Sequence, residues 1–187
     1  MRDKAGRLVG IMLLVFISLQ FSCASNKMER KNTKLAEAYF NLGTDYLQEG
    51  EYDGALSVLN KALEINPNYT EAYLNRGIAY SRKNQHDQAV SDYSRVLEIN
   101  PKDVRAYCNR GNVYVEKGLY DQAISDYTKA LKINSRDARI FYNRGIAYFL
   151  ERKYDKSQED INKAKELGYP IPPEFLDDLS KALEGKK

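Results

Sequence analysis

Few side chains in this sequence could carry catalytic chemistry. The one histidine, His86, excludes sites built from several histidines, and two cysteines, Cys23 and Cys108, are too few for a structural zinc site. No glycine-rich phosphate loop follows an expected strand. The position of Cys108 in the pattern described below is filled elsewhere by Phe40, Leu74 and Tyr142, which indicates a small buried hydrophobe. We therefore expect no enzyme activity, no cofactor and no metal.

Three evenly spaced arginines could anchor an anion, but each has an aspartate sixteen residues later. The pairs are Arg76 with Asp92, Arg110 with Asp126, and Arg144 with Asp160. At the corresponding positions nearer the N-terminus, Leu42 is matched by Val58. A polar residue thus accompanies a polar one, and an apolar residue an apolar one. We interpret the arginines as structural, each paired with its aspartate across two packed helices.

Four asparagines share one spacing of 34 residues: Asn41, Asn75, Asn109 and Asn143. An asparagine amide offers a donor and an acceptor together, which suits the backbone of an extended peptide. The alternative is that these amides bond only to neighbouring helices.

Length and composition set the class of protein. The chain has 187 residues, with 43% hydrophobic and 29% charged residues, which fits one ordinary domain and is too rich in core formers for a disordered chain. The net charge is +3, and beyond residue 22 it falls to 26 basic against 25 acidic side chains. This balance lacks the excess of basic residues that is typical of nucleic-acid-binding proteins.

The N-terminal segment is typical of a secretory signal. Arg2, Lys4 and Arg7 precede an uncharged run over residues 8–21, which is shorter than the roughly 20 residues that a spanning helix needs. We predict a signal peptide over residues 1–22 and a polar tether over residues 23–35. An uncleaved membrane anchor is the alternative.

The end of this segment resembles a bacterial lipobox, in which a cysteine after a small residue becomes the lipidated N-terminus. Ser22 and Cys23 fit that pattern, whereas Gln20 and Phe21 depart from it. The resemblance implies lipid attachment at Cys23 and a lipoprotein of the bacterial cell envelope, held at the outer or inner membrane on the periplasmic side. Cleavage after Ala24 is the alternative, and it would give a soluble secreted or periplasmic protein.

Most of the remaining chain follows the 34-residue period. Glycines, tyrosines and aspartates recur in phase with the asparagines and divide the chain into four units, residues 36–69, 70–103, 104–137 and 138–171. Apolar residues within each unit follow two helical stripes separated by a polar break. In the second unit we expect Asp87 to cap the second helix and Asn100-Pro101 to end it. Each unit is therefore predicted to be two antiparallel helices.

The residues at fixed offsets resemble the tetratricopeptide repeat. The third unit carries the pattern in Tyr107, Gly111, Tyr114, Ala123, Tyr127 and Ala130. The resemblance implies an all-α fold, a right-handed α-solenoid of four helix-turn-helix repeats. After Pro172-Pro173, the apolar residues Phe175, Leu179 and Leu183 are spaced four apart, so residues 172–187 are predicted to form a C-terminal capping helix.

The same resemblance implies a protein or peptide ligand on the concave surface formed by the first helices, and no small-molecule substrate. The candidate peptide-binding residues are Asn75, Arg105, Asn109, Asn112, Arg139 and Asn143. Some family members clamp a C-terminal carboxylate, but Phe40 and Thr44 stand where the leading lysine and asparagine of that clamp belong.

We therefore expect a non-catalytic interaction scaffold or adaptor, attached to the membrane through its N-terminal lipid anchor. A more specific form is an assembly factor for a secretion or pilus system. The alternative is a regulatory subunit of an envelope enzyme such as a cell-wall hydrolase.

Overall fold

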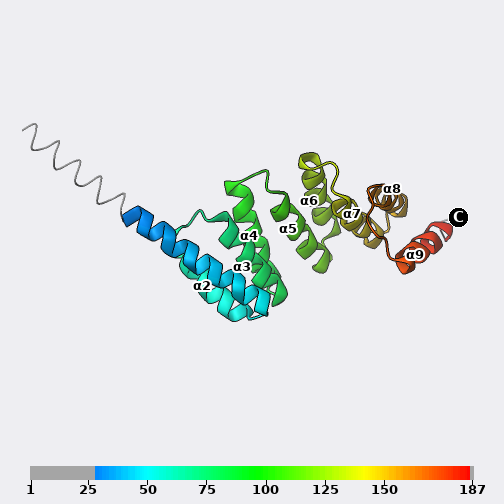
Figure 1. Ribbon diagram of the computed structural model, residues 1–187. Helices are drawn as coiled ribbons and strands as arrows, with labels where there is room; N and C mark the ends of the chain where they lie inside the picture. The colour runs from blue at the N-terminus through cyan, green and yellow to red at the C-terminus, as the bar shows by residue number, and fades with distance from the viewer. Residues whose placement is uncertain (1–27, 186–187) are drawn as a thin grey trace, which may run out of the picture.

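The computed structural model describes residues 28–185, and every regular element within that range is a helix (Figure 1). The signal segment and Cys23 lie outside the described residues. A first helix covers residues 28–49 and is called the N-terminal helix below. It is followed by α2 (Tyr52–Ile65), α3 (Thr70–Arg82), α4 (His86–Ile99), α5 (Val104–Glu116), α6 (Tyr120–Ile133), α7 (Ala138–Leu150), α8 (Tyr154–Glu166) and α9 (Pro173–Glu184). No helix in the described range is long and apolar enough to cross a membrane.

The helices form a solenoid of four helical hairpins and a final helix (Figure 1). The first hairpin is the N-terminal helix with α2, the second α3 with α4, the third α5 with α6, and the fourth α7 with α8. Successive hairpins pack through α2 on α3, α4 on α5 and α6 on α7, while α3 also contacts α5 and α5 contacts α7. The first helices of the hairpins therefore share one layer, the inner layer, and the second helices share the outer layer.

The start of the first hairpin differs from the sequence prediction. Residues 28–35, expected as part of the polar tether, are helical and run without a break into the first repeat. Neither proline nor glycine interrupts this stretch, and its glutamate, arginine and lysines are good helix formers.

The glycines that recur every 34 residues let the two helices of a hairpin approach closely. A Cβ added to Gly77 would lie 2.6 Å from the Tyr93 ring, and one added to Gly111 would lie 2.8 Å from the Tyr127 ring. Both tyrosines are almost completely buried. The aromatic residue of the second helix thus occupies the space that the glycine leaves open.

The expected cap at Asp87 is wrong. Helix α4 begins at His86, so its N-cap residue is Gln85, and Asp87 instead accepts a hydrogen bond from Lys117 in the turn after α5. Lys83 makes the corresponding contact with Asp53 of the first hairpin. Asp53 and Asp87 therefore link neighbouring hairpins, and Asp87 does not cap the N-terminus of its own helix. The expected end of α4 is confirmed, because the helix stops at Ile99, before Asn100-Pro101.

Helix α9 covers the end of the last hairpin. Its Leu179 is buried, and its Phe175 ring lies 5.2 Å from the Phe149 ring and 6.2 Å from the Tyr142 ring of α7. The fourth hairpin also has Ser157 where the others have alanine, and this buried hydroxyl donates a hydrogen bond of 2.8 Å to the carbonyl oxygen of Gly145. The hydroxyl is thus satisfied within its own hairpin.

Candidate functional site

The three Arg–Asp pairs form as predicted. In the third hairpin, Arg110 Nε and Nη2 donate to the two carboxylate oxygens of Asp126 at 2.7 and 2.9 Å. Burial disfavours the charged guanidinium, but the hydrogen bonds and charge of Asp126 outweigh it and raise the pKa of Arg110 above its ordinary value. Arg76 with Asp92 and Arg144 with Asp160 have the same two-bond geometry.

Each arginine also reaches the preceding hairpin, which the sequence reasoning missed. Arg110 Nη1 donates to Ser94 Oγ of α4 at 2.8 Å. Arg76 bonds Asn60 in the same way at 2.6 Å, and Arg144 bonds Thr128 at 3.0 Å. The arginines therefore join three helices and act as structural braces. The available signal was a polar residue sixteen positions before each arginine, but its type changes from one hairpin to the next.

Some of the asparagines that recur every 34 residues already form side-chain hydrogen bonds within the protein. Asn75 Nδ2 donates to Thr44 Oγ1 at 2.9 Å, and Asn143 Nδ2 donates to Asn112 Oδ1 at 3.3 Å. Both amides therefore bond to the inner helix of the preceding hairpin. Asn109 differs, because the residue that corresponds to Thr44 and Asn112 in its preceding hairpin is Ile78, which has no hydrogen-bonding side chain.

The two predicted arginines at the start of the inner helices remain exposed. Arg105 Nη2 lies 2.8 Å from Asp103 and 3.7 Å from Glu71, and Arg139 lies 3.6 Å from Asp137. Asp103 is the N-cap of α5 and accepts a hydrogen bond from the Ala106 N–H at 3.1 Å. Burial opposes ionisation of Asp103, but its bonds from Arg105 and the backbone outweigh it and lower the pKa of that carboxyl.

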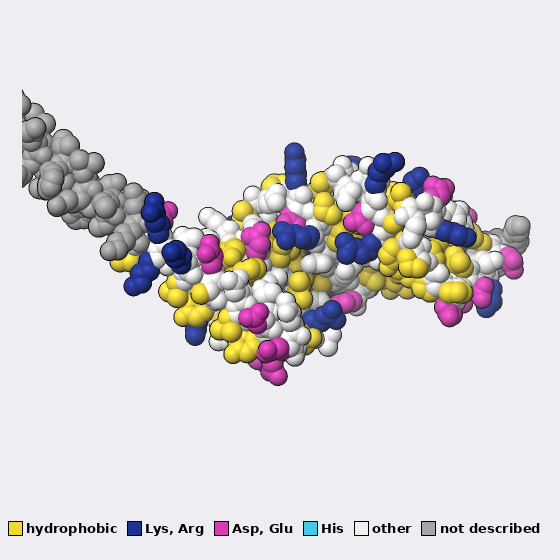
Figure 2. All heavy atoms as spheres, viewed as in Figure 1, with side chains coloured by type: hydrophobic (Ala, Val, Ile, Leu, Met, Phe, Trp, Pro, Cys, Tyr) yellow, Lys and Arg dark blue, Asp and Glu magenta, His cyan; other side chains and the backbone are white. Residues whose placement is uncertain are grey.

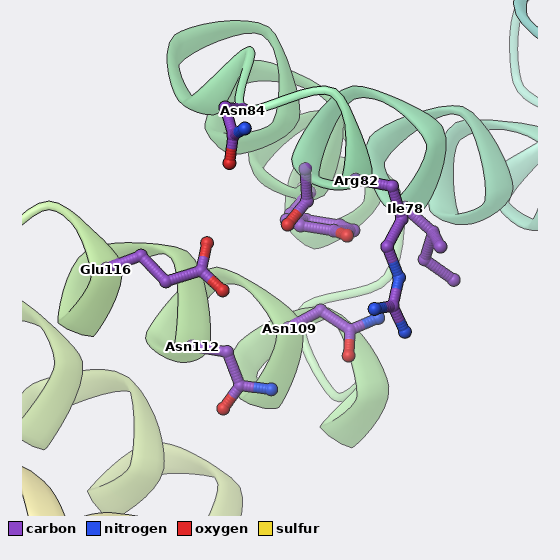
Figure 3. A pocket seen from close by; sticks show the side chains of 8 residues that line it. Ile78, Arg82, Asn84, Asn109, Asn112 and Glu116 are labelled. Atoms are coloured by element: carbon purple, nitrogen blue, oxygen red, sulfur yellow. The ribbon is translucent and has the colours of Figure 1, made fainter. Parts of the chain in front are cut away.

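A polar cavity of about 340 Å³ lies between the second and third hairpins. It is lined by Ile78, Ser81, Arg82, Asn84, Tyr93, Asn109, Asn112 and Glu116. Figure 3 shows the Asn109 side chain of α5 beside that of Arg82 from α3, whereas the Asn112 side chain points away from α3. Of the six predicted binding residues, Asn109 and Asn112 line this cavity, and the other four lie outside its lining. Arg82, Tyr93 and Glu116 also line the cavity and were not among the predicted binding residues.

Cys108 and His86 are the remaining groups that could react. Burial raises the pKa of the Cys108 thiol to about 11, so it stays protonated near neutral pH. His86 Nδ1 lies 3.4 Å from Glu116 Oε2. Figure 2 shows basic and acidic side chains interspersed over the visible face of the described residues.

The repeats match a known family. Residues 43–84, 80–118 and 111–150 match the family described as TPR repeat, and residues 138–167 match the one described as tetratricopeptide repeat. The chain belongs to the tetratricopeptide repeat family. Members of this family generally bind protein partners and are generally non-catalytic, which supports a protein-interaction scaffold.

Several solved structures share the fold. A crystal structure of MamA is 26% identical, with a TM-score of 0.69 over 76% of this chain and 83% of that one. MamA from Desulfovibrio magneticus RS-1, residues 41 to its end, is also 26% identical, with a TM-score of 0.67 over 71% of this chain and 75% of that one. PilF from Pseudomonas aeruginosa, at 23% identity, shows the fold alone, with a TM-score of 0.71 over 83% of this chain and 71% of that one. No curated protein matches.

Proposed function

We propose that this protein is a non-catalytic adaptor that binds an extended segment of a partner protein on its inner layer. The observation that carries the proposal is Asn109. Its side chain lines an open polar cavity and has no hydrogen-bond partner within residues 28–185, whereas Asn75 and Asn143 are bonded to neighbouring hairpins. An amide that offers a donor and an acceptor in a groove matches the backbone of a bound peptide.

The surroundings of Asn109 on α5 support the same reading. Arg105, Asn109 and Asn112 are four and three residues apart, so they share one face of the helix. Arg105 is exposed and can meet an acidic side chain of the partner at the edge of that face. The face therefore combines neutral amides for the backbone with one positive charge for selectivity.

The adaptor is proposed to be held at a bacterial envelope membrane by lipid on Cys23. Cys23 precedes Met28, the first described residue of the N-terminal helix, by five positions. Even a fully extended chain of that length spans at most about 18 Å. The lipid would therefore hold the first hairpin close to the membrane surface. We extend the proposal to an assembly factor for a secretion or pilus system, the role that the sequence resemblance suggests.

Affinity capture from native membranes, followed by mass spectrometry, tests the adaptor proposal. Asn109→Ala and Arg105→Ala should each reduce recovery of the partner. Asn109→Ala should leave the melting temperature nearly unchanged, whereas Arg105→Ala should lower it modestly because Asp103 keeps only its backbone bond. The Arg105→Ala effect should also shrink as salt rises, because exposed charges are screened. Asn162→Ala on the outer layer is the matched control and should recover the partner fully. Equal recovery by Asn109→Ala and wild type would remove the inner layer as the binding surface.

A further inference from the structure

The hairpins provide an internal comparison for the residues around Asn109. One position of the inner helices bonds the asparagine of the next hairpin through Thr44 and Asn112. That position holds Thr44, Ile78, Asn112 and Ile146 in the four hairpins, and the position fifteen residues later holds Leu59, Tyr93, Tyr127 and Ile161.

In the third hairpin the two positions form a complete polar set. Asn112 Oδ1 accepts one hydrogen bond from Tyr127 Oη at 2.6 Å and another from Asn143 Nδ2 at 3.3 Å. One amide oxygen therefore satisfies a buried phenol and the asparagine of the following hairpin.

In the second hairpin that acceptor is missing. Ile78 stands where Asn112 does, while the two donors remain as Tyr93 and Asn109. Tyr93 is 1% exposed, lines the cavity, and makes no side-chain hydrogen bond within the described part of the chain. The first and fourth hairpins have no such mismatch, because Leu59 and Ile161 stand at the tyrosine position.

An unpartnered phenol in this setting favours an acceptor supplied from outside. The Tyr93 ring is buried, but the residue lines the cavity, so a ligand that provides an oxygen there gains a hydrogen bond that no protein group makes with this hydroxyl. The cavity of about 340 Å³ leaves room for such a group beside the Ile78 side chain.

We propose that this cavity is a subsite for one neutral amide carbonyl of the bound protein segment. Its oxygen takes the place that Asn112 Oδ1 has in the third hairpin and accepts from Tyr93 Oη and Asn109 Nδ2. This inference rests on the proposed adaptor function and specifies the chemistry of its ligand.

The charges around the cavity favour a neutral acceptor over a carboxylate. Arg82 and Glu116 both line it, so their opposite charges leave no net attraction for an anion. Burial, with the nearby charges of Asp92 and Glu116, raises the pKa of Tyr93 well above its ordinary value. The phenol is therefore a donor at every physiological pH.

The full-length protein, purified in detergent, can be titrated with N-methylacetamide and, separately, with sodium acetate. The readout is the Asn109 side-chain amide signal in nitrogen–proton NMR spectra. We expect N-methylacetamide to shift this signal saturably and acetate to have a much weaker effect. Tyr93→Phe should weaken the response to N-methylacetamide roughly 2- to 10-fold, the equivalent of one hydrogen bond. A missing Asn109 response, a stronger response to acetate, or an unchanged response in Tyr93→Phe would overturn the subsite.

Matched variants separate binding from folding. Tyr93→Phe should leave the melting temperature almost unchanged, because its hydroxyl has no partner in the protein, whereas Tyr127→Phe should lower it by removing the bond to Asn112. Ile78→Asn places the protein's own amide in the subsite and should abolish the N-methylacetamide response. Ile146→Asn, at the same position of the fourth hairpin, should retain that response. An equal drop in melting temperature for both Tyr→Phe variants would contradict the unpartnered state of Tyr93.

An arrayed library of random ten-residue peptides, blocked at both ends, distinguishes this inference from the adaptor proposal. If peptides bind and Tyr93→Phe and Ile78→Asn weaken them, both proposals are supported. If peptides bind equally well to these variants, the subsite is refuted and the adaptor function stands. If no peptide binds but N-methylacetamide still shifts Asn109, the subsite stands and the extended-peptide function is refuted.

Discussion

The Arg110–Asp126 pair gives a quantitative test of the brace between hairpins. Asp126 is buried, with 3% of its side chain exposed, and both its oxygens accept from Arg110. Arg110→Leu leaves this carboxylate unpaired, which costs about 3–5 kcal/mol for a buried charge. Lys129 Nζ, 3.9 Å from Asp126 Oδ1, offsets a small part of the loss. The Ser94 hydroxyl also loses its donor. We therefore expect the free energy of unfolding to fall by about 4 kcal/mol in total.

The reverse variant should be milder. Asp126→Val leaves a guanidinium that keeps its bond to Ser94 and lies 5.9 and 5.8 Å from the Tyr107 and Tyr114 ring centres. Because of these contacts, we expect the free energy of unfolding to fall by only about 2 kcal/mol. Arg110→Leu with Asp126→Val reproduces the Leu42 and Val58 solution of the first hairpin and should lose about 3 kcal/mol, less than Arg110→Leu alone. The resulting coupling energy is about 3 kcal/mol.

Urea unfolding followed by far-ultraviolet circular dichroism measures these free energies of unfolding. The exposed pair Arg95 and Glu98 is the matched control, since a salt bridge of 2.8 Å at the surface should couple by less than about 0.5 kcal/mol. Additive losses at Arg110 and Asp126, within about 0.5 kcal/mol, would refute the reasoning that the pair acts as one buried unit.

Three further predictions follow from other parts of the chain. Cys23→Ser should abolish lipid labelling and release the protein from membranes, and a native protein that begins at Ser25 would contradict lipidation. Deletion of residues 172–187 removes buried Leu179 and the contact of Phe175 with Phe149, so it should lower the melting temperature or cause aggregation; an unchanged melting temperature in a monomeric truncation would refute the cap. The lowered pKa of Asp103 stabilises the fold above the carboxyl's unfolded pKa and loses that effect as pH falls below about 4. Asp103→Asn, which keeps an N-cap oxygen, should therefore show a smaller loss of stability on acidification, and an equal loss would contradict this assignment.

The repeat period explains why so much of the fold could be predicted from the sequence. Gly77 and its neighbours recur four times in phase, and this pattern predicts helical hairpins. In each hairpin the glycine packs against an aromatic or aliphatic side chain. The Arg110–Asp126 pair was predictable for the same reason, because both members change together between the first hairpin and the others.

What could not be predicted depends on contacts between hairpins. The third bond of each arginine goes to Asn60, Ser94 or Thr128, and three different residue types do not form a visible pattern. Asp87 was assigned to a helix cap because capping is a local rule, yet it bonds Lys117 thirty residues away. The free state of Asn109 likewise depends on Ile78 of another hairpin, so its neighbours on α5 do not reveal it.

Departures from the repeat pattern have two different causes, and only one of them points to binding. Leu42 replaces the arginine in the first hairpin, where no earlier hairpin in the described chain could accept the third hydrogen bond. Ser157 likewise departs from the pattern in the last of the described hairpins, which has a neighbouring hairpin on one side only. Ile78 lies in the second hairpin with neighbours on both sides, so no end effect accounts for an apolar residue opposite the buried phenol of Tyr93. A ligand that supplies the missing acceptor would give this mismatch a function. The substitution Ile78→Asn therefore discriminates a binding subsite from a tolerated packing variation.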